Sequence, residues 1–301
     1  MYYNLSASLF RHVTTPHAVI RAMTQSGSDN PIGVFDSGVG GLTILRAVRQ
    51  ALPCENLVYV ADAAYVPYGQ KSPEQIRDRA LLIGGFLVQQ GVKAVVVACN
   101  TATAEAIDVL RARWPIPFVG VEPAVKPAVA ATRSGVVGVL ATPATLASAR
   151  FRSLIERVAA SIQVVAQPCA GLAEHIERGE IDGERIEQLL RGFVEPALAA
   201  RADVIVLGCT HYPLVAHIVQ RIAGPGVAVI ENGTAVAREV SRQLMLRGSA
   251  RASGSGGEMF WSSGPTMGIA PLLMELWAPH ARLQRLPELQ GNAGPGFNAT
   301  S

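Results

Sequence analysis

The chain has 301 residues, of which 49% are hydrophobic and only 16% are charged. A charged fraction so far below the typical ~25% argues against a disordered chain, a coiled coil or a nucleic-acid-binding arm, and a net charge of +3 is too small to attract a phosphate polymer. No apolar run reaches the ~18 residues needed to span a bilayer, so we expect a soluble α/β protein of about two domains that binds neither nucleic acid nor membrane.

The first 31 residues are expected to form an N-terminal extension outside the folded part of the chain. The stretch before Asp29 has no acidic residue and carries Arg11 and Arg21, a composition compatible with a transit peptide. It lacks the apolar core of about 7–15 residues that marks a secretory signal, and Met23 offers an internal start ahead of the first apolar run. We predict a disordered extension, with a targeting segment or a packed helix as the alternatives.

From residue 32 onward, short apolar runs alternate with amphipathic segments. The apolar runs predict strands at 32–36, 57–61, 94–98, 117–121, 136–140, 162–166, 203–207 and 227–230. Helices are expected at 42–51, 73–90, 101–113, 144–158, 183–199, 213–223 and 233–247. This alternation is typical of right-handed βαβ units and a parallel sheet.

Later in the chain, RASGSGG indicates a flexible connector and MFWSSG indicates one more strand. Residues 291–301 are expected to be a disordered tail.

Two pairs of similar segments indicate an internal repeat. VKAVVVACNTATAEAI and ADVIVLGCTHYPLVAHI each combine a strand, a cysteine, a hydroxyl residue and a helix, with Cys99 and Cys209 separated by 110 residues. PIGVFDSGVGGLTIL and VVGVLATPATLASAR are also similar, with Gly33 and Gly138 separated by 105 residues. The similar offsets predict two related α/β lobes that face each other.

Cys99 and Cys209 are the strongest candidates for chemistry. Each follows the last apolar residue of a strand and precedes a helix, where ligands of open α/β sheets bind. The helix dipole at this position favours a thiolate over a thiol. A single cysteine after a buried strand is usually a core residue, but two at matching places in a repeat favour a function. Cys54 and Cys169 do not end strands, and we expect them to be structural.

Further candidate residues lie in short polar motifs near other strand ends. DSGVGGLT lacks the glycine spacing of a dinucleotide site and the Gly-Lys-Ser/Thr of a phosphate loop, so its backbone N–H groups suit a carboxylate equally well. Asp36 in this motif is either a site carboxylate or a helix cap.

THYP places His211 two residues after Cys209, where a histidine can tune or reprotonate a thiolate, although a lone histidine is more often structural. Thr142 and Thr145 are hydroxyl donors for a ligand or helix N-caps.

The chain resembles the glutamate racemase family in four motifs taken in order: DSGVGG, VPYGQK, ACNTAT and LGCTHYP. The resemblance extends from about Ile32 to about Glu231, with a weaker likeness at FWSSG. The resemblance implies a cytoplasmic, cofactor-independent racemase that supplies D-glutamate for peptidoglycan. It implies two pseudo-symmetric α/β domains, each a mostly parallel sheet flanked by helices, with the active site in the cleft between them. The first domain would comprise 32–124 plus about 235–290, and the second 125–234. Such racemases are often homodimers, and no interface is visible in the sequence.

The resemblance also implies roles for individual residues. Cys99 would exchange the proton of D-glutamate and Cys209 that of L-glutamate, with Asp36 and His211 assisting the respective thiols. Glu177, in the IERGE stretch, would be a further site acid. Contacts with the glutamate substrate would fall on Asp36, Ser37, Tyr68, Gly69, Asn100, Thr101, Thr142, Thr145, Thr210 and His211. One departure lies at the lip of the pocket, where many members have a GDTARVPYG-like run and this chain has ADAAYVPYG.

The chemistry of racemisation agrees with two thiols. One acid/base must remove the Cα proton on one face while another returns a proton on the opposite face, which a thiolate and a thiol from facing repeats can do. The alternative of pyridoxal phosphate needs a Schiff-base lysine, and Lys71, Lys93 and Lys126 are the only lysines and none ends a predicted strand. No cysteine pair has metal-ligand spacing either, so neither a cofactor nor a metal is expected.

Other functions remain open at this stage. An aspartate or hydantoin racemase shares the two-cysteine logic, although PYG and CTHYP favour glutamate. A non-catalytic, two-lobed amino-acid-binding protein would need neither cysteine. A hydrolase with a cysteine nucleophile would need one cysteine and its histidine.

Overall fold

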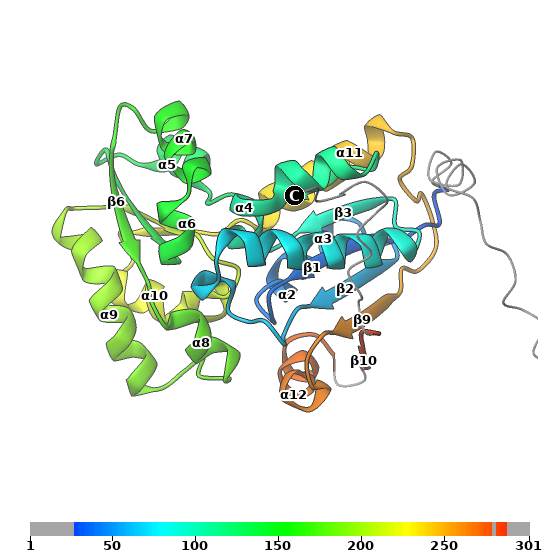
Figure 1. Ribbon diagram of the computed structural model, residues 1–301. Helices are drawn as coiled ribbons and strands as arrows, with labels where there is room; N and C mark the ends of the chain where they lie inside the picture. The colour runs from blue at the N-terminus through cyan, green and yellow to red at the C-terminus, as the bar shows by residue number, and fades with distance from the viewer. Residues whose placement is uncertain (1–26, 279–280, 288–301) are drawn as a thin grey trace, which may run out of the picture.

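The computed structural model describes residues 27–278 and 281–287, so the expected extension up to residue 26 and the expected tail from residue 291 lie outside the described residues. The described part contains two sheets, in which every paired strand runs parallel to its neighbours. Helices flank both sheets, and each sheet with its helices forms one lobe (Figure 1). The predicted fold class is confirmed.

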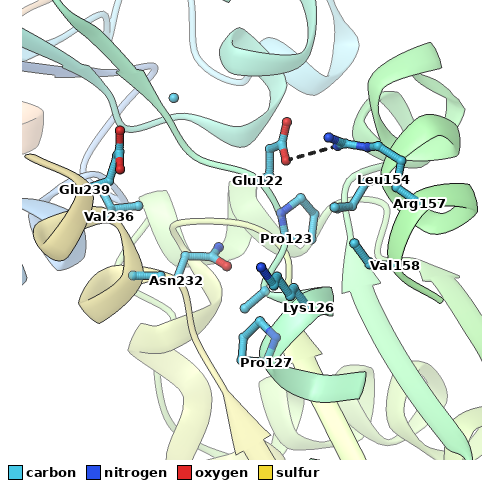
Figure 2. A pocket seen from close by; sticks show the side chains of 13 residues that line it. Glu122, Pro123, Lys126, Pro127, Leu154, Arg157, Val158, Asn232, Val236 and Glu239 are labelled. Atoms are coloured by element: carbon cyan, nitrogen blue, oxygen red, sulfur yellow. Dashed lines mark ion pairs between the residues drawn. The ribbon is translucent and has the colours of Figure 1, made fainter. Parts of the chain in front are cut away.

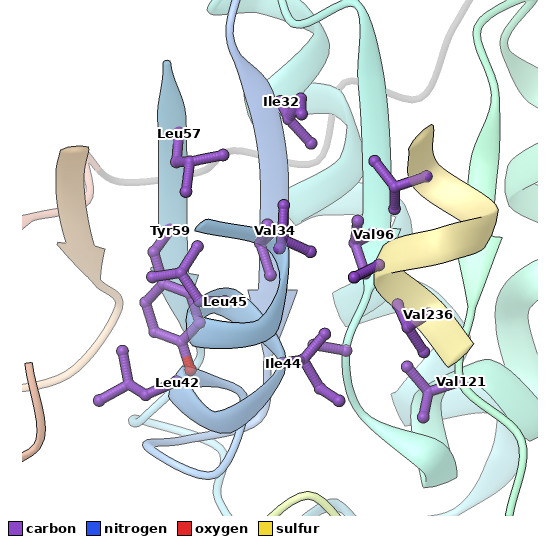
Figure 3. Close-up of a cluster of buried hydrophobic side chains, with 14 of the residues drawn as sticks. Ile32, Val34, Leu42, Ile44, Leu45, Leu57, Tyr59, Val96, Val121 and Val236 are labelled. Carbon is purple, nitrogen blue, oxygen red and sulfur yellow. The ribbon is translucent and has the colours of Figure 1, made fainter. Parts of the chain in front are cut away.

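The first lobe is built on a six-stranded sheet in the order β10-β9-β2-β1-β3-β4. Its strands are β1 (Ile32–Asp36), β2 (Leu57–Ala61), β3 (Ala94–Val97), β4 (Phe118–Gly120), β9 (Glu258–Ser262) and β10 (Leu283–Arg285). Its helices are α2 (Leu42–Ala51), the 3-10 turn η1 (Tyr68–Gln70), α3 (Pro73–Gln89), α4 (Asn100–Arg113), α11 (Gly233–Leu246) and α12 (Thr266–Leu276). Successive side chains of a strand point to opposite faces, so Val34 packs with α2 and α11 (Figure 3) while Phe35 packs with α3 and α4.

The second lobe is built on a four-stranded sheet in the order β6-β5-β7-β8. Its strands are β5 (Val136–Ala141), β6 (Gln163–Pro168), β7 (Val204–Leu207) and β8 (Ala228–Ile230). Its helices are α5 (Val125–Ala131), α6 (Pro143–Ala147), α7 (Ala149–Val158), α8 (Leu172–Glu177), α9 (Glu184–Ala199), the 3-10 turn η2 (Tyr212–Val215) and α10 (Ala216–Ala223). Helices α5 and α7 cover one face, and α8, α9 and α10 cover the other.

The predicted strands are all present within two residues of their expected bounds, and MFWSSG forms β9. The single helix expected at 144–158 is wrong: it is two helices, because the Ser148 hydroxyl accepts a hydrogen bond from the Phe151 N–H (3.1 Å) and starts α7 anew. The helix expected at 213–223 begins as the turn η2. Helices α5, α8 and α12 were not predicted. None of the helices in the described ranges is long and apolar enough to cross a membrane.

A buried ion pair holds three segments together at the amino-terminal end of β3. Lys93 Nζ lies 2.5 Å from Glu55 Oε2, and both side chains are at most 1% exposed. The same ammonium donates to the carbonyls of Ser28 (2.6 Å) and Ser249 (2.8 Å), and Glu55 Oε1 accepts the Arg251 N–H at 2.8 Å. The pair therefore connects β3 to the segments before β1 and after α11.

We expect Lys93→Met to lower the free energy of unfolding by about 3–5 kcal/mol, because it leaves the Glu55 carboxylate buried without its partner. The measurement is urea unfolding followed by circular dichroism. Arg242→Met is the matched control, since its pair with Glu239 is 56% and 40% exposed and should contribute less than about 0.5 kcal/mol. Equal effects of the two substitutions would contradict this role of Lys93.

Candidate active site

The candidate residues gather where strands of the two sheets end. Asp36 is the last residue of β1, Cys99 follows β3 as the N-cap of α4, and Cys209 follows β7 just before η2. Both cysteines are 6% exposed, and Asp36 is fully buried. The other expected side chains, apart from the 12%-exposed Glu177, are at most 8% exposed. The lobes therefore meet over these groups with little solvent between them.

The Cys99 thiol lies against the first lobe's glycine-rich turn. Its Sγ accepts the Ala102 N–H at 3.5 Å and donates toward Ser37 Oγ at 3.8 Å. Burial, and then the nearby Asp36 carboxylate, raise the pKa of Cys99 to about 12. Burial therefore opposes the thiolate that the helix dipole was expected to favour, because the loss of solvation outweighs one backbone hydrogen bond.

On the second lobe, Cys209 begins a chain of polar groups. Its Sγ lies 3.6 Å from His211 Nδ1, and His211 Nε2 lies 2.6 Å from Glu177 Oε1. Burial alone would favour the neutral imidazole, but the hydrogen bonds with Cys209 and Glu177 prevail and raise the pKa of His211 well above its usual value. The hydrogen bonds thus favour the protonated imidazole, which lies between the Cys209 sulfur and the Glu177 carboxyl group.

Asp36 and Glu177 each bridge the two lobes. Glu177 Oε1 accepts the Val39 N–H at 2.7 Å, and Asp36 Oδ2 accepts the Thr210 hydroxyl at 3.0 Å. Asp36 Oδ1 accepts the Gly38 N–H at 2.8 Å, so the carboxylate does not cap α2. Burial raises the pKa of Asp36. One of its two hydrogen bonds therefore crosses to the second lobe, and its charge contributes to the raised pKa of Cys99.

Two glycines of GVGG, Gly38 and Gly40, are explained by the close approach of the second lobe. A Cβ atom on Gly38 would lie 1.7 Å from Glu177 Oε1, and one on Gly40 would lie 2.6 Å from His211 Nδ1. These positions have room for a hydrogen atom only. The glycine-rich turn thus admits the His211 and Glu177 side chains of the other lobe.

A cluster of threonines joins the lobes on another side of the site. Thr101 Oγ1 lies 3.1 Å from Thr142 Oγ1 and 3.3 Å from Thr145 Oγ1, and the latter two are 2.9 Å apart. The Thr145 N–H also donates to Thr142 Oγ1, so Thr142 caps α6 as well. Next to this cluster, the buried Asn100 Oδ1 has no hydrogen-bond partner among the described residues. Three hydroxyls in contact suit a carboxylate, which accepts several hydrogen bonds at once.

The phenol of Tyr68, the first residue of η1, is directed into the first lobe. Tyr68 is 2% exposed, and its hydroxyl donates to Asp62 Oδ2 at 2.6 Å inside the first lobe. Burial raises the pKa of Tyr68 well above its usual value. The α-carbon side of Gly69 faces Thr142, since a Cβ built there would lie 3.5 Å from the threonine Cβ.

Sequence reasoning missed several supporting residues. Tyr59, inside the apolar run LVYVA, donates its hydroxyl to the Gly38 carbonyl at 2.6 Å. Thr43 donates to the Thr210 carbonyl at 3.1 Å. The sequence signal for Tyr59 was a single hydroxyl-bearing side chain in an otherwise apolar strand. The sequence contained no comparable signal for Thr43. Cys169 is buried, and Cys54 is partly buried.

A cavity between the lobes is separate from the thiols. It measures about 410 Å³ and lies where the chain passes between the lobes, lined by residues before and within α5, in α7 and at the start of α11 (Figure 2). The polar side chains that reach into the cavity are those of Lys126, Arg157 and Asn232. At its edge, Glu122 forms an ion pair with Arg157. Neither cysteine lines this cavity.

Comparisons with known proteins agree with the two-lobed α/β fold. Residues 41–240 match the family model described as Asp/Glu/Hydantoin racemase. The glutamate racemase of Methylococcus capsulatus is 51% identical over 87% of this chain and 97% of its own length. A glutamate racemase isoform of Bacillus anthracis superposes with a TM-score of 0.81 at 28% identity, over 87% of this chain and 98% of that one. The Francisella tularensis glutamate racemase, solved with D-glutamate, has a TM-score of 0.77 at 29% identity, over the same shares of the two chains.

Proposed function

The chain belongs to the Asp/Glu/hydantoin racemase family and is an amino-acid racemase, and on this premise we propose that it interconverts L- and D-glutamate by proton transfer at Cα between two cysteines. One observation carries the mechanism: Cys99 and Cys209 end corresponding strands of two facing lobes, and both are buried at the lobe boundary. The substrate follows from the half-identical relative and from the D-glutamate complex of the Francisella protein.

In the proposed reaction, D-glutamate loses its Cα proton to the Cys99 thiolate. The Cys209 thiol then gives a proton to the opposite face of the planar carbanion, and L-glutamate leaves. Each turnover therefore exchanges the protonation states of the two thiols, and the L-to-D reaction is the same sequence in reverse. No electron or group is transferred to a co-reactant.

The active thiolate has to be formed in the loaded site. A pKa of about 12 keeps Cys99 as the thiol at neutral pH. The substrate brings an ammonium group, and an opposite charge nearby lowers the pKa of a thiol. On the other side, His211 Nδ1 lies next to the Cys209 sulfur, with Glu177 holding the ring, so the imidazole is placed to exchange a proton with that sulfur.

The two carboxylates and the ammonium of glutamate have matching partners. We assign the side-chain carboxylate to the hydroxyls of Thr101, Thr142 and Thr145 with the backbone of the Tyr68–Gly69 turn. The buried Asp36 carboxylate suits the ammonium group, and Ser37, Asn100, Thr210 and His211 complete the contacts around the α-carbon.

We also propose the biological setting that accompanies this activity: supply of D-glutamate for peptidoglycan in the cytoplasm. The same proposal divides the chain into a first domain of 32–124 plus about 235–290 and a second of 125–234. A homodimer is the proposed assembly, by likeness to the family.

The test is racemisation without added cofactor. Purified protein with EDTA is mixed with L-glutamate, L-aspartate or L-alanine, and the circular dichroism of the amino acid is followed. We expect the glutamate signal to decay to zero, since the enantiomers are equally stable, and deuterium from D₂O to appear at Cα. Faster decay with L-aspartate would favour the related aspartate activity. A requirement for pyridoxal phosphate would contradict the mechanism.

A further inference from the structure

The run ADAAYVPYG, which departs from the family pattern, is the outer part of a polar network behind the substrate-binding turn. Tyr65, in this run, is 41% exposed, and the guanidinium carbon of Arg79 lies 3.8 Å from the centroid of its ring. Arg79 is on α3, which flanks the first sheet. The cation is thus covered by an aromatic face on its outer side.

The inner side of the same guanidinium binds a buried carboxylate. Arg79 Nε and Nη2 donate to Asp62 Oδ2 and Oδ1 at 3.0 and 2.8 Å, a bidentate pair in which Asp62 is 0% and Arg79 13% exposed. Asp62 Oδ2 also accepts the Tyr68 hydroxyl at 2.6 Å. One carboxylate therefore connects α3 to the first residue of η1.

The network reaches both the catalytic strand and the second lobe. The Asp62 N–H donates to the carbonyl of Asp36, at 2.9 Å. Beyond Tyr68, Gly69 faces Thr142, and Gln70 Nε2 donates to Glu174 Oε1 of α8 at 2.6 Å. The position of this turn therefore sets the distance between the wall of the first lobe and the threonines of the second.

We propose that Arg79 is a positioning residue for this substrate-binding wall: by clamping Asp62 it fixes the Tyr68 hydroxyl, and with it the backbone that contacts the substrate. The inference rests on the proposed function and adds to that site a residue that holds the substrate-binding turn in place. The planar fork of arginine matches a carboxylate at two points, which the single ammonium of lysine does not. Without Arg79, the buried Asp62 carboxylate lacks its cation, and its hydrogen bond with the Tyr68 hydroxyl changes.

The main experiment compares Arg79→Met, Arg79→Lys and a control on the same helix. The control is Arg77→Met, whose side chain is 35% exposed and pairs with the 70%-exposed Glu74. We expect Arg79→Met to raise KM for both glutamate enantiomers about tenfold or more, with kcat changed less than about threefold. Arg79→Lys should give an intermediate KM, and Arg77→Met should stay within about twofold of the wild type.

A second variant tests the connection through Asp62. Tyr68→Phe removes one hydroxyl and leaves the ion pair, and it should raise KM by itself. If Arg79 acts through Tyr68, the double variant Arg79→Met/Tyr68→Phe has the KM of Arg79→Met alone. Multiplied effects would overturn the proposal, as would an unchanged KM or a fall confined to kcat in Arg79→Met. Should that variant be insoluble, Arg79→Lys and Tyr68→Phe decide by the same criteria.

Calorimetric titration with D-glutamate separates this inference from the proposed function. The Kd values of the variants should rise in the same order as KM. A wild-type protein that binds D-glutamate but does not racemise it would contradict the proposed function, and the Kd series would still test Arg79.

Discussion

Replacing Cys99 by alanine is expected to slow the interconversion of the glutamate enantiomers by about 10³–10⁴-fold, and Cys209→Ala to do the same. Each thiol serves one face of Cα, so the loss of either leaves one proton transfer without its acid or base. Circular dichroism of the amino acid measures the rate. Cys169→Ala is the control, because this buried cysteine is given no part in the proton transfer. Full activity in either of the first two variants would exclude the two-thiol mechanism.

Isotope exchange in the same variants distinguishes the two thiols. Cys99→Ala retains Cys209, so in D₂O it should incorporate deuterium into L-glutamate and leave D-glutamate unlabelled. Cys209→Ala should show the opposite preference. Both should produce the other enantiomer only at the slow residual rate expected above. The reversed pattern would exchange the roles assigned to the two cysteines, and equal labelling of both enantiomers by one variant would contradict the assignment of a face to each thiol.

Gly38→Ala is expected to lower kcat by about 10²-fold or more while the fold is retained. The new methyl group would lie 1.7 Å from Glu177 Oε1, so the carboxylate has to move away from the Val39 N–H and from His211. Displacements of about 1 Å in a catalytic constellation cost rates of this order. The obstacle is the end of a flexible side chain, so the free energy of unfolding should change little.

Two comparisons establish that the effect arises at Glu177. Gly192→Ala adds a methyl group within the exposed part of α9, where nothing lies within 4 Å, and should leave kcat unchanged. The double variant Gly38→Ala/Glu177→Ala should be no slower than Glu177→Ala alone, because the obstructed group is gone. A double variant slower by a further 10²-fold would mean that Gly38 acts through another contact.

The strands and the two cysteines were predictable because their signals are local. A run such as AVVVACNT contains a buried parallel strand, the end of that strand and the start of a helix within eight residues. The repeat then indicated that two such ends belong to one cleft. Glu177 and Thr101 were expected only through resemblance, since nothing near them in the sequence says which residues they meet.

The remaining properties of the site depend on contacts between distant residues. Arg79 reaches Asp62 from the next helix, and an arginine in an amphipathic segment is ordinarily solvated. The thiol of Cys99 was expected to ionise from the dipole of its own helix, but its burial has the larger effect. The break at Ser148 depends on a capping geometry that the apolar periodicity of 144–158 does not reveal.

The order of strands in the first sheet has a consequence for the synthesis of the chain. Tyr59 of β2 pairs with Phe260 of β9, whereas all four strands of the second sheet lie within residues 136–230. As the ribosome extends the chain, the second lobe has every strand it needs before β9 emerges. Until then, the side of β2 that will pair with β9 has no partner strand. The residues of β2 are all buried in the finished protein, so this apolar edge is open to other chains in the meantime. We expect the lobe that is translated first to be completed last, and its unfinished edge to be the stage most exposed to aggregation.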